Sequence, residues 1–338
     1  MKLASRKAWG KASRWLIAIA SLGYVAYFLL SNREHIEPLF RLRPLILVLL
    51  VVAQTVAMLV ASIRYHVVLQ KCGDRKIPLL AWARLYVLGQ FANIMIPQAG
   101  NLLRSVRLKR DWGVSYTRYV SSYLSYQWID TALSIVLGEA VILATQPGFR
   151  LGAFRATTVL GGALAAVILL PFAVRAALAR VVLRPPWAVW VHEKVSQAVD
   201  VSVTSVRDGT YMGKTLSLGV LGFALQVTVI WLGFACLDIR IGLSGIVLIS
   251  VLLRLGLILQ ITPGNIGVRE LVWGALGEFA HVGMAAGLLA ALLFRMISTL
   301  LIFALGILCG GVELLRNRPR EDTPDSAEPD RNAREGTP

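Results

Sequence analysis

Long apolar segments alternate with short basic segments along the chain. Six of the apolar segments carry few or no charges and have about the 20 residues that a helix needs to cross a bilayer. They are residues 15–32, 44–63, 119–145, 156–174, 215–235 and 282–312. Two further apolar segments, 77–103 and 241–280, are interrupted by Pro and Gly. This pattern predicts an all-α polytopic membrane protein.

The distribution of Lys and Arg predicts the orientation of these spans. Most basic residues lie in five segments, and few lie in the loops between them. The five segments are 1–14, 64–76, 104–118, 175–214 and 316–320. Because cytoplasmic loops of membrane proteins collect Lys and Arg, both termini are expected in the cytoplasm.

The interrupted segment 77–103 lies between two basic segments that are both expected in the cytoplasm, 64–76 and 104–118. A segment that crosses once cannot have both ends on one side, so we predict a re-entrant pair of short helices. The same reasoning makes 241–280 a re-entrant segment from the outer face. The chain then has about six full spans and two re-entrant segments, as an inverted repeat. Such broken helices line protein-enclosed or wet cavities, so an internal cavity is expected.

These assignments divide the chain into four parts. They are a basic cytoplasmic N-terminus (1–14), a first membrane half (15–145), a second membrane half (146–315) and a disordered cytoplasmic tail (316–338). Residues 185–210, within the second half, have apolar positions at helical spacing. They are expected either as an amphipathic helix on the membrane surface or as a simple connector.

Composition supports a membrane protein and excludes a soluble enzyme as the main body. Hydrophobic residues make up 56% of the 338 residues and charged residues only 16%, against about 25% charged in soluble domains. The net charge is +16. Because orientation in the membrane explains that charge, no nucleic-acid partner is expected.

The strongest local motif, residues 262–270, lies within the segment 241–280. Here Pro and Gly unwind the chain before Arg and Glu open a short helix. Its residues include Pro263, Gly264, Asn265, Gly267, Arg269 and Glu270. A helix start presents unpaired N–H groups, and with an arginine it can bind a phosphate. Pro97 to Arg104 repeats these ingredients in the first half. The alternative is a tight turn in which Arg269 reaches the interface or pairs with Glu270.

Several charged residues lie well inside apolar segments. These are Asp130, Glu139, Arg254 and Arg295. A charge at the centre of a membrane helix costs about 2.5–3.5 kcal/mol on insertion scales, so these side chains should face the interior. When the two halves are aligned, Gln127 corresponds to Arg295, and Asp130 lies close to the same position. Asp130 and Arg295 are therefore candidate partners. A purely structural ion pair is the alternative to a polar path or proton coupling.

The usual catalytic and metal motifs are missing from the sequence. There is no GxxxxGK[ST], no HExxH and no GxSxG motif. Cys72, Cys236 and Cys309 are scattered and form no CxxC pair. We therefore expect no cofactor, no metal and no catalytic residue.

The segment TPGNIGVRE resembles the proline-glycine-glycine-x-glycine-x-arginine-glutamate signature of the lysylphosphatidylglycerol synthase transmembrane-region family. The segment PQAGNLLRSVRLKRDWGVSYTRYVSSYLSYQWID is similar to the first-half pattern of that family. The resemblance covers about residues 10–315. Asn265 stands where a second glycine is usual, and Tyr126-Gln127 stand where Glu-Arg is usual, while Asp130 is kept.

This resemblance implies a stand-alone flippase-like protein of a prokaryotic cytoplasmic membrane. It would move or bind an anionic or modified phospholipid, or a polyprenyl-linked lipid, between leaflets. The sequence carries no aminoacyl-transferase domain, so synthesis of lysyl-lipids is not expected. An alternative is a non-transport subunit that presents lipid to a partner glycosyltransferase or aminoacyl-transferase. An enzyme acting on the head group would have only Asp130 and Glu139 as acid or base. A homodimer stays an open option.

Overall fold

The computed structural model describes residues 41–72, 76–95, 98–180, 209–256 and 267–310, with the isolated positions 23 and 27. Within this part the chain is almost entirely helical. The helices are α2 (Pro44–Cys72), α3 (Leu79–Met95), α4 (Ala99–Trp112), α5 (Tyr116–Thr145), α6 (Ala156–Arg180), α8 (Gly209–Cys236), α9 (Leu243–Gly256), α10 (Val268–Phe279) and α11 (Met284–Leu308). The predicted all-α class is confirmed, apart from one small hairpin.

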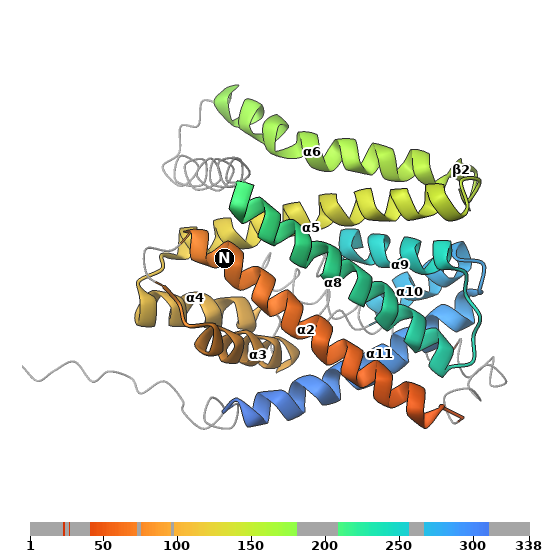
Figure 1. The fold of residues 1–338 in the computed structure, drawn as a ribbon, viewed down its shortest axis with the longest axis horizontal. Coiled ribbons are helices and arrows are strands. Elements are labelled where there is room, and N and C mark those ends of the chain that lie inside the picture. Colours follow the sequence, from red (N-terminus) through yellow and green to blue (C-terminus); the bar gives the residue numbers. More distant parts are fainter. Residues whose placement is uncertain are drawn as a thin grey trace, which may run out of the picture.

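Two long helices, α2 and α8, cross the middle of the molecule side by side (Figure 1). On one side of this pair α5 packs against α9, and on the other α3 packs against α11. Helix α6 lies along α5 as an outer layer (Figure 1). Elements from both halves of the sequence are therefore interleaved around the α2–α8 pair.

The break predicted within 77–103 is present. Helix α3 ends at Met95 and α4 begins at Ala99, after Gln98 with a left-handed φ of 65°. The backbone N–H of Gly100 donates a hydrogen bond to Asn93 Oδ1 at 2.7 Å, which ties the two helices together. Helix α4 continues to Trp112, beyond the predicted end at 103. Entry of this pair from one side of a bilayer stays a prediction.

The segment 241–280 is also divided into two helices, α9 and α10. They contact each other less than α3 and α4 do, because α9 packs mainly on α5 and α10 on α11. A short antiparallel hairpin, β1 (Arg150–Leu151) and β2 (Phe154–Arg155), joins α5 to α6. It is a minor departure from the helical prediction.

Four helices in the described residues are long and apolar enough to cross a membrane. They are Pro44–Gln70, Tyr116–Thr145, Gly209–Cys236 and Met284–Leu308. The predicted span 156–174 corresponds to α6, whose apolar part, Ala156–Leu170, is shorter. The predicted span 15–32 falls almost wholly outside the described residues. Six spans are therefore not established, whereas an integral membrane protein is.

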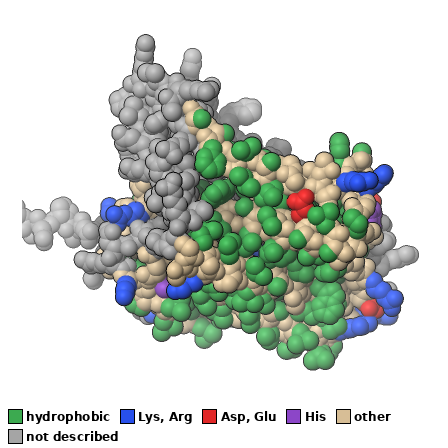
Figure 2. Space-filling view, turned by 45° about the horizontal axis from the view of Figure 1, so that its top comes forward, with side chains coloured by type: hydrophobic (Ala, Val, Ile, Leu, Met, Phe, Trp, Pro, Cys, Tyr) green, Lys and Arg blue, Asp and Glu red, His purple; other side chains and the backbone are tan. Residues whose placement is uncertain are grey.

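The outside of the bundle matches this assignment. Leu45, Val48, Val52 and Leu59 are exposed along α2, and Leu169 and Leu170 on α6. Figure 2 shows one face covered by hydrophobic side chains, with Lys and Arg gathered toward its two ends. An apolar belt between basic ends is the surface expected of a helix bundle in lipid.

Several predicted elements fall outside the residues that the structure describes. They are the basic N-terminus 1–14, the candidate surface helix 185–210 (apart from its last two residues), the tail 316–338 and the motif residues Pro263, Gly264 and Asn265. These assignments stay predictions.

Candidate functional site

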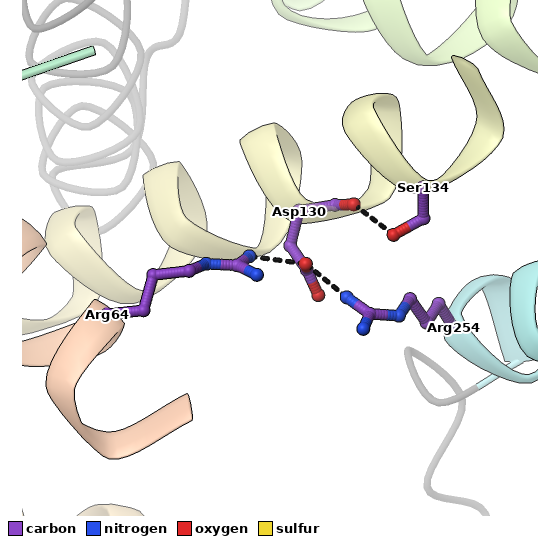
Figure 3. Close-up of polar contacts among 4 residues, drawn as sticks. All are labelled: Arg64, Asp130, Ser134 and Arg254. Atoms are coloured by element: carbon purple, nitrogen blue, oxygen red, sulfur yellow. Dashed lines mark hydrogen bonds and ion pairs between the residues drawn. The ribbon is translucent and has the colours of Figure 1, made fainter. Parts of the chain in front are cut away.

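An ionic cluster centred on Asp130 lies in the middle of the bundle. Arg64 of α2 and Arg254 of α9 both form ion pairs with Asp130 Oδ1 of α5, from opposite sides of the carboxylate (Figure 3). The side chains of Arg64 and Asp130 are 3% and 13% exposed. Two arginines on one carboxylate leave a net charge of +1. The cluster joins three helices that are distant in sequence.

The pairing of Asp130 differs from the sequence prediction. Arg295, the expected partner, pairs with Glu270 instead, so the predicted Asp130–Arg295 pair is wrong. Arg64 was assigned to the cytoplasmic basic segment 64–76, but it is buried and lies 4.6 Å over the ring of Tyr126. Helix α2 continues past the apolar run to Cys72. Arg64 therefore lies within a helix of the bundle and not in a loop, which the basic character of segment 64–76 did not indicate.

Arg104 of α4 is a second buried cation, only 4% exposed. Its guanidinium donates hydrogen bonds to Asn101 Oδ1 and to the carbonyl of Tyr86, both at 3.2 Å, and lies 4.9 Å over the Tyr86 ring. Among the described residues no carboxylate pairs with it. Gly89 of α3 makes room for it, because a Cβ there would overlap the guanidinium. A buried charge with only neutral partners is a candidate anion-binding group.

These arginines line one cavity of about 310 Å³, here called the first cavity. It lies between α2, α3, α4, α5, α8 and α9, and its wall includes Arg64, Arg104, Asp130 and Arg254. Amides and tyrosines complete the wall. They are Gln90, Asn93, Asn101, Gln127 and Gln226, with Tyr65, Tyr86, Tyr123 and Tyr126. The volume is at the lower end of the range for small-molecule sites.

A second cavity, of about 190 Å³, lies between α2, α8, α9, α10 and α11. Its wall includes Arg269, Ser250 and Ser298. Arg254 and Gln226 line both cavities. The polar first cavity and the mainly apolar second cavity therefore meet at the Arg254 side chain, which is also bound to Asp130.

Glu270 is held by contacts near the start of α10. Its Oε1 lies 2.5 Å from Arg295 Nε, and its Oε2 accepts the N–H of Gly267 at 2.8 Å. A carboxylate at this position closes the helix start in the manner of a capping box. The alternative pairing of Glu270 with Arg269 is not seen. Arg269 instead lines the second cavity and makes no ion pair with any described residue.

The described candidate residues thus divide into three groups, and Glu139 belongs to none of them. Arg104, Arg254, Asp130 and Gln127 meet at the first cavity, and Arg254 and Arg269 at the second. Glu270 and Arg295 pair with each other. Glu139 lines neither cavity and faces α6. Its Oε1 is 3.6 Å from the point that a Cβ would occupy if Gly161 carried a side chain.

The sequence prediction also missed the amides at Gln90, Asn93, Asn101 and Gln226. Each of them stands within an otherwise apolar segment. Polar residues inside apolar helices tend to face the interior of a bundle. The positions of these amides along the helices were therefore the signal that could have found them.

The fold and the cavities define an α-helical integral membrane protein with a basic polar interior. A model of the family described as "Lysylphosphatidylglycerol synthase TM region" matches residues 15–306, and the chain belongs to this family. The comparison with curated proteins gave no match, and neither did the comparison with solved structures. The family indicates a membrane domain associated with lipid handling.

Proposed function

We propose that this protein binds the anionic head group of a membrane lipid in the first cavity and moves it between leaflets. Arg104 carries the proposal, because it is a buried guanidinium without a carboxylate partner in the described part of the chain, at the wall of a cavity. Burial of an uncompensated charge is costly, and a phosphate would offset that cost with charge-assisted hydrogen bonds. The remaining excess charge of the Asp130 cluster adds to the attraction.

A route between the leaflets follows from the two cavities. A charged head group cannot cross about 30 Å of hydrocarbon unaided. In the proposed route it passes from Arg104 to Arg254, which borders both chambers, and then to Arg269. The acyl chains would stay in the surrounding lipid. The sequence also offers Asp130 and Glu139 as proton carriers and Arg295 and Glu270 as head-group ligands. Of these four residues, Asp130 lines the first cavity and the other three line neither cavity, so the proposed route uses Asp130 alone.

An inverted repeat would give the route its two entrances. The helices α2, α3, α4 and α5 have 29, 17, 14 and 30 residues, and α8, α9, α10 and α11 have 28, 14, 12 and 25. Under this pairing α2 meets its counterpart α8, and the α5–α9 contact corresponds to α11–α3. We propose that the first cavity opens to the cytoplasm and the second to the outer face of a prokaryotic inner membrane, with both termini cytoplasmic.

A transport assay tests the proposal. The full chain is reconstituted into vesicles that contain fluorescent phosphatidylglycerol, and dithionite reduces the fluorophores that reach the outer leaflet. We expect Arg104→Gln to slow lipid exchange at least about tenfold, since a hydrogen bond to a charged group contributes about 1.5–3 kcal/mol. Arg110→Gln is the matched control, because Arg110 is exposed and pairs with the adjacent Asp111.

Two results would contradict the proposal. One is exchange in protein-containing vesicles no faster than in empty vesicles. The other is an Arg104→Gln rate equal to that of the Arg110→Gln control at matched protein content. A protein that bound lipid without exchanging it would favour the alternative role, presentation of lipid to a partner transferase.

A further inference from the structure

We infer that the first cavity selects a phosphate head group rich in hydroxyls, such as a polyol or sugar, over a head group that carries an amine. This inference rests on the proposed function, because it specifies the lipid that the same cavity takes. It is based on the side chains of the cavity wall that do not bind the phosphate in the proposed function.

The first observation is the set of unused amides. Gln90, Gln127 and Gln226 come from α3, α5 and α8 and line the cavity from three sides. None of these side chains forms a hydrogen bond with another described residue. Each amide offers two donors and an acceptor. Hydroxyl groups both donate and accept, so a polyol can satisfy the N–H donors and also the carbonyl acceptor of these amides. An acyl ester or an ionised phosphate offers only acceptors.

The second observation is the charge of the wall. Three arginines and one aspartate face the cavity, a net charge of +2. Asp130 is already bound by Arg64 and Arg254. An incoming ammonium group would meet no available carboxylate and would be repelled by the guanidinium groups at short range. A head group with one phosphate and no amine is matched to this wall.

The third observation concerns the tyrosine rings. Cation recognition by aromatic side chains requires open ring faces. One face of the Tyr126 ring lies under the Arg64 guanidinium at 4.6 Å, and one face of the Tyr86 ring lies under the Arg104 guanidinium at 4.9 Å. Tyr65 also stacks on Tyr126, with 5.2 Å between ring centroids. These covered faces are not available as a cage for a quaternary ammonium. Their contribution is to hold the two cations in place.

Competition binding tests the inference. The purified full chain in detergent is loaded with fluorescent phosphatidylglycerol, which is displaced by phosphatidylinositol, phosphatidic acid or lysylphosphatidylglycerol. We expect phosphatidylinositol to displace the probe at about tenfold lower concentration than phosphatidic acid, and lysylphosphatidylglycerol to be at least about tenfold weaker than phosphatidylinositol. Gln127→Leu should weaken phosphatidylinositol about fivefold and leave phosphatidic acid unchanged, as expected for one neutral hydrogen bond.

Gln146→Leu is the matched control, because this glutamine is exposed at the end of α5 and lines neither cavity. Gln127→Glu is the second variant, and it should raise the affinity for lysylphosphatidylglycerol relative to phosphatidylinositol by placing a free carboxylate in the wall. Thermal unfolding of each variant shows that it is folded.

The outcomes separate the two proposals. Equal displacement by phosphatidylinositol and phosphatidic acid would overturn the hydroxyl-selective cavity while leaving anionic lipid binding intact. A Gln127→Leu variant that weakens both lipids equally, or a Gln127→Glu variant without altered preference, would also overturn it. If no anionic lipid displaces the probe specifically, the proposed function fails first and the selectivity with it.

Discussion

Two carboxylates are buried among the residues that the structure describes, Asp130 and Glu270, and they are neutralised in different ways. Asp130 sits between two arginines from separate helices, α2 and α9, and the group keeps a net positive charge. Glu270 has one arginine partner from α11 and a backbone N–H of its own helix start. The first arrangement attracts further anions, whereas the second is complete in itself.

Under the proposed function, this difference separates a charge cluster that binds a ligand from an ion pair that supports the fold. Asp130 and Arg64 line the first cavity, and Arg254 lines both cavities, so a ligand in either cavity can reach this cluster. Glu270 is 2% exposed and lines neither cavity. By occupying Arg295 and Gly267, it fixes the start of α10 and leaves the neighbouring Arg269 to face the second cavity. Under the proposed function, the motif therefore divides into a ligand-binding residue, Arg269, and a residue that supports it, Glu270.

The largest expected effect is that of Asp130→Asn. The substitution leaves the buried Arg64 and the half-buried Arg254 without a counter-charge, which should lower stability by about 3–5 kcal/mol. Thermal unfolding of the full chain in detergent measures it. Asp238→Asn is the control: its pair with Arg43 is exposed on both sides, so its loss should cost under about 1 kcal/mol. Equal effects of the two substitutions would mean that the cluster is not buried as described.

Glu270→Gln should have a smaller effect, of about 1.5–3 kcal/mol, the range for a hydrogen bond to a charged group. The amide oxygen of Gln still accepts the Gly267 N–H, and the Arg295 side chain is 25% exposed, so water relieves part of its charge. The same unfolding measurement checks this. A loss larger than that of Asp130→Asn would reverse the contrast between the two carboxylates.

Close helix contacts provide a third test, with an expected loss of about 1–3 kcal/mol from overpacking. A Cβ at Gly100 would overlap the carbonyl of Gly89 on α3, and one at Gly287 would overlap the carbonyl of Trp273 on α10. We expect Gly100→Ala and Gly287→Ala to lower the unfolding temperature. Gly162→Ala on α6 meets open space, so an equal loss there would discount close packing as the cause.

Ser134→Ala should have the smallest effect. Ser134 Oγ donates to the backbone carbonyl of Asp130 at 2.6 Å (Figure 3) and does not contact the carboxylate. Serine bonds of this kind within one turn stabilise a helix little, so a change under about 1 kcal/mol is expected. A loss near that of Asp130→Asn would show that this serine positions the carboxylate.

The helix positions followed closely from the hydropathy pattern. The predicted spans 44–63, 119–145, 215–235 and 282–312 correspond to α2, α5, α8 and α11. The breaks in the two Pro- and Gly-containing segments were also anticipated. These features depend on local composition, because a chain in lipid must satisfy its backbone hydrogen bonds within each helix. The cavity wall was predicted only in part, through Arg104, Arg254, Asp130 and Gln127.

The partners of the buried charges could not be predicted in the same way. Asp130 and Arg295 occupy similar sequence positions, yet each pairs with another residue. A salt bridge depends on the rotation of each helix and on which helices are neighbours. A small change in the rotation of one helix therefore moves a charged side chain from one partner to another.

The sequence by itself determined that this is a helical membrane protein of its family, since apolar length and the spacing of Pro, Gly and Arg are written along the chain. Only the tertiary structure decided that Arg64 belongs to the interior and that Arg254 borders both cavities. The physical reason is that these relations arise where α2, α5, α8 and α9 pack together, and packing between segments distant in sequence is not encoded in any one of them.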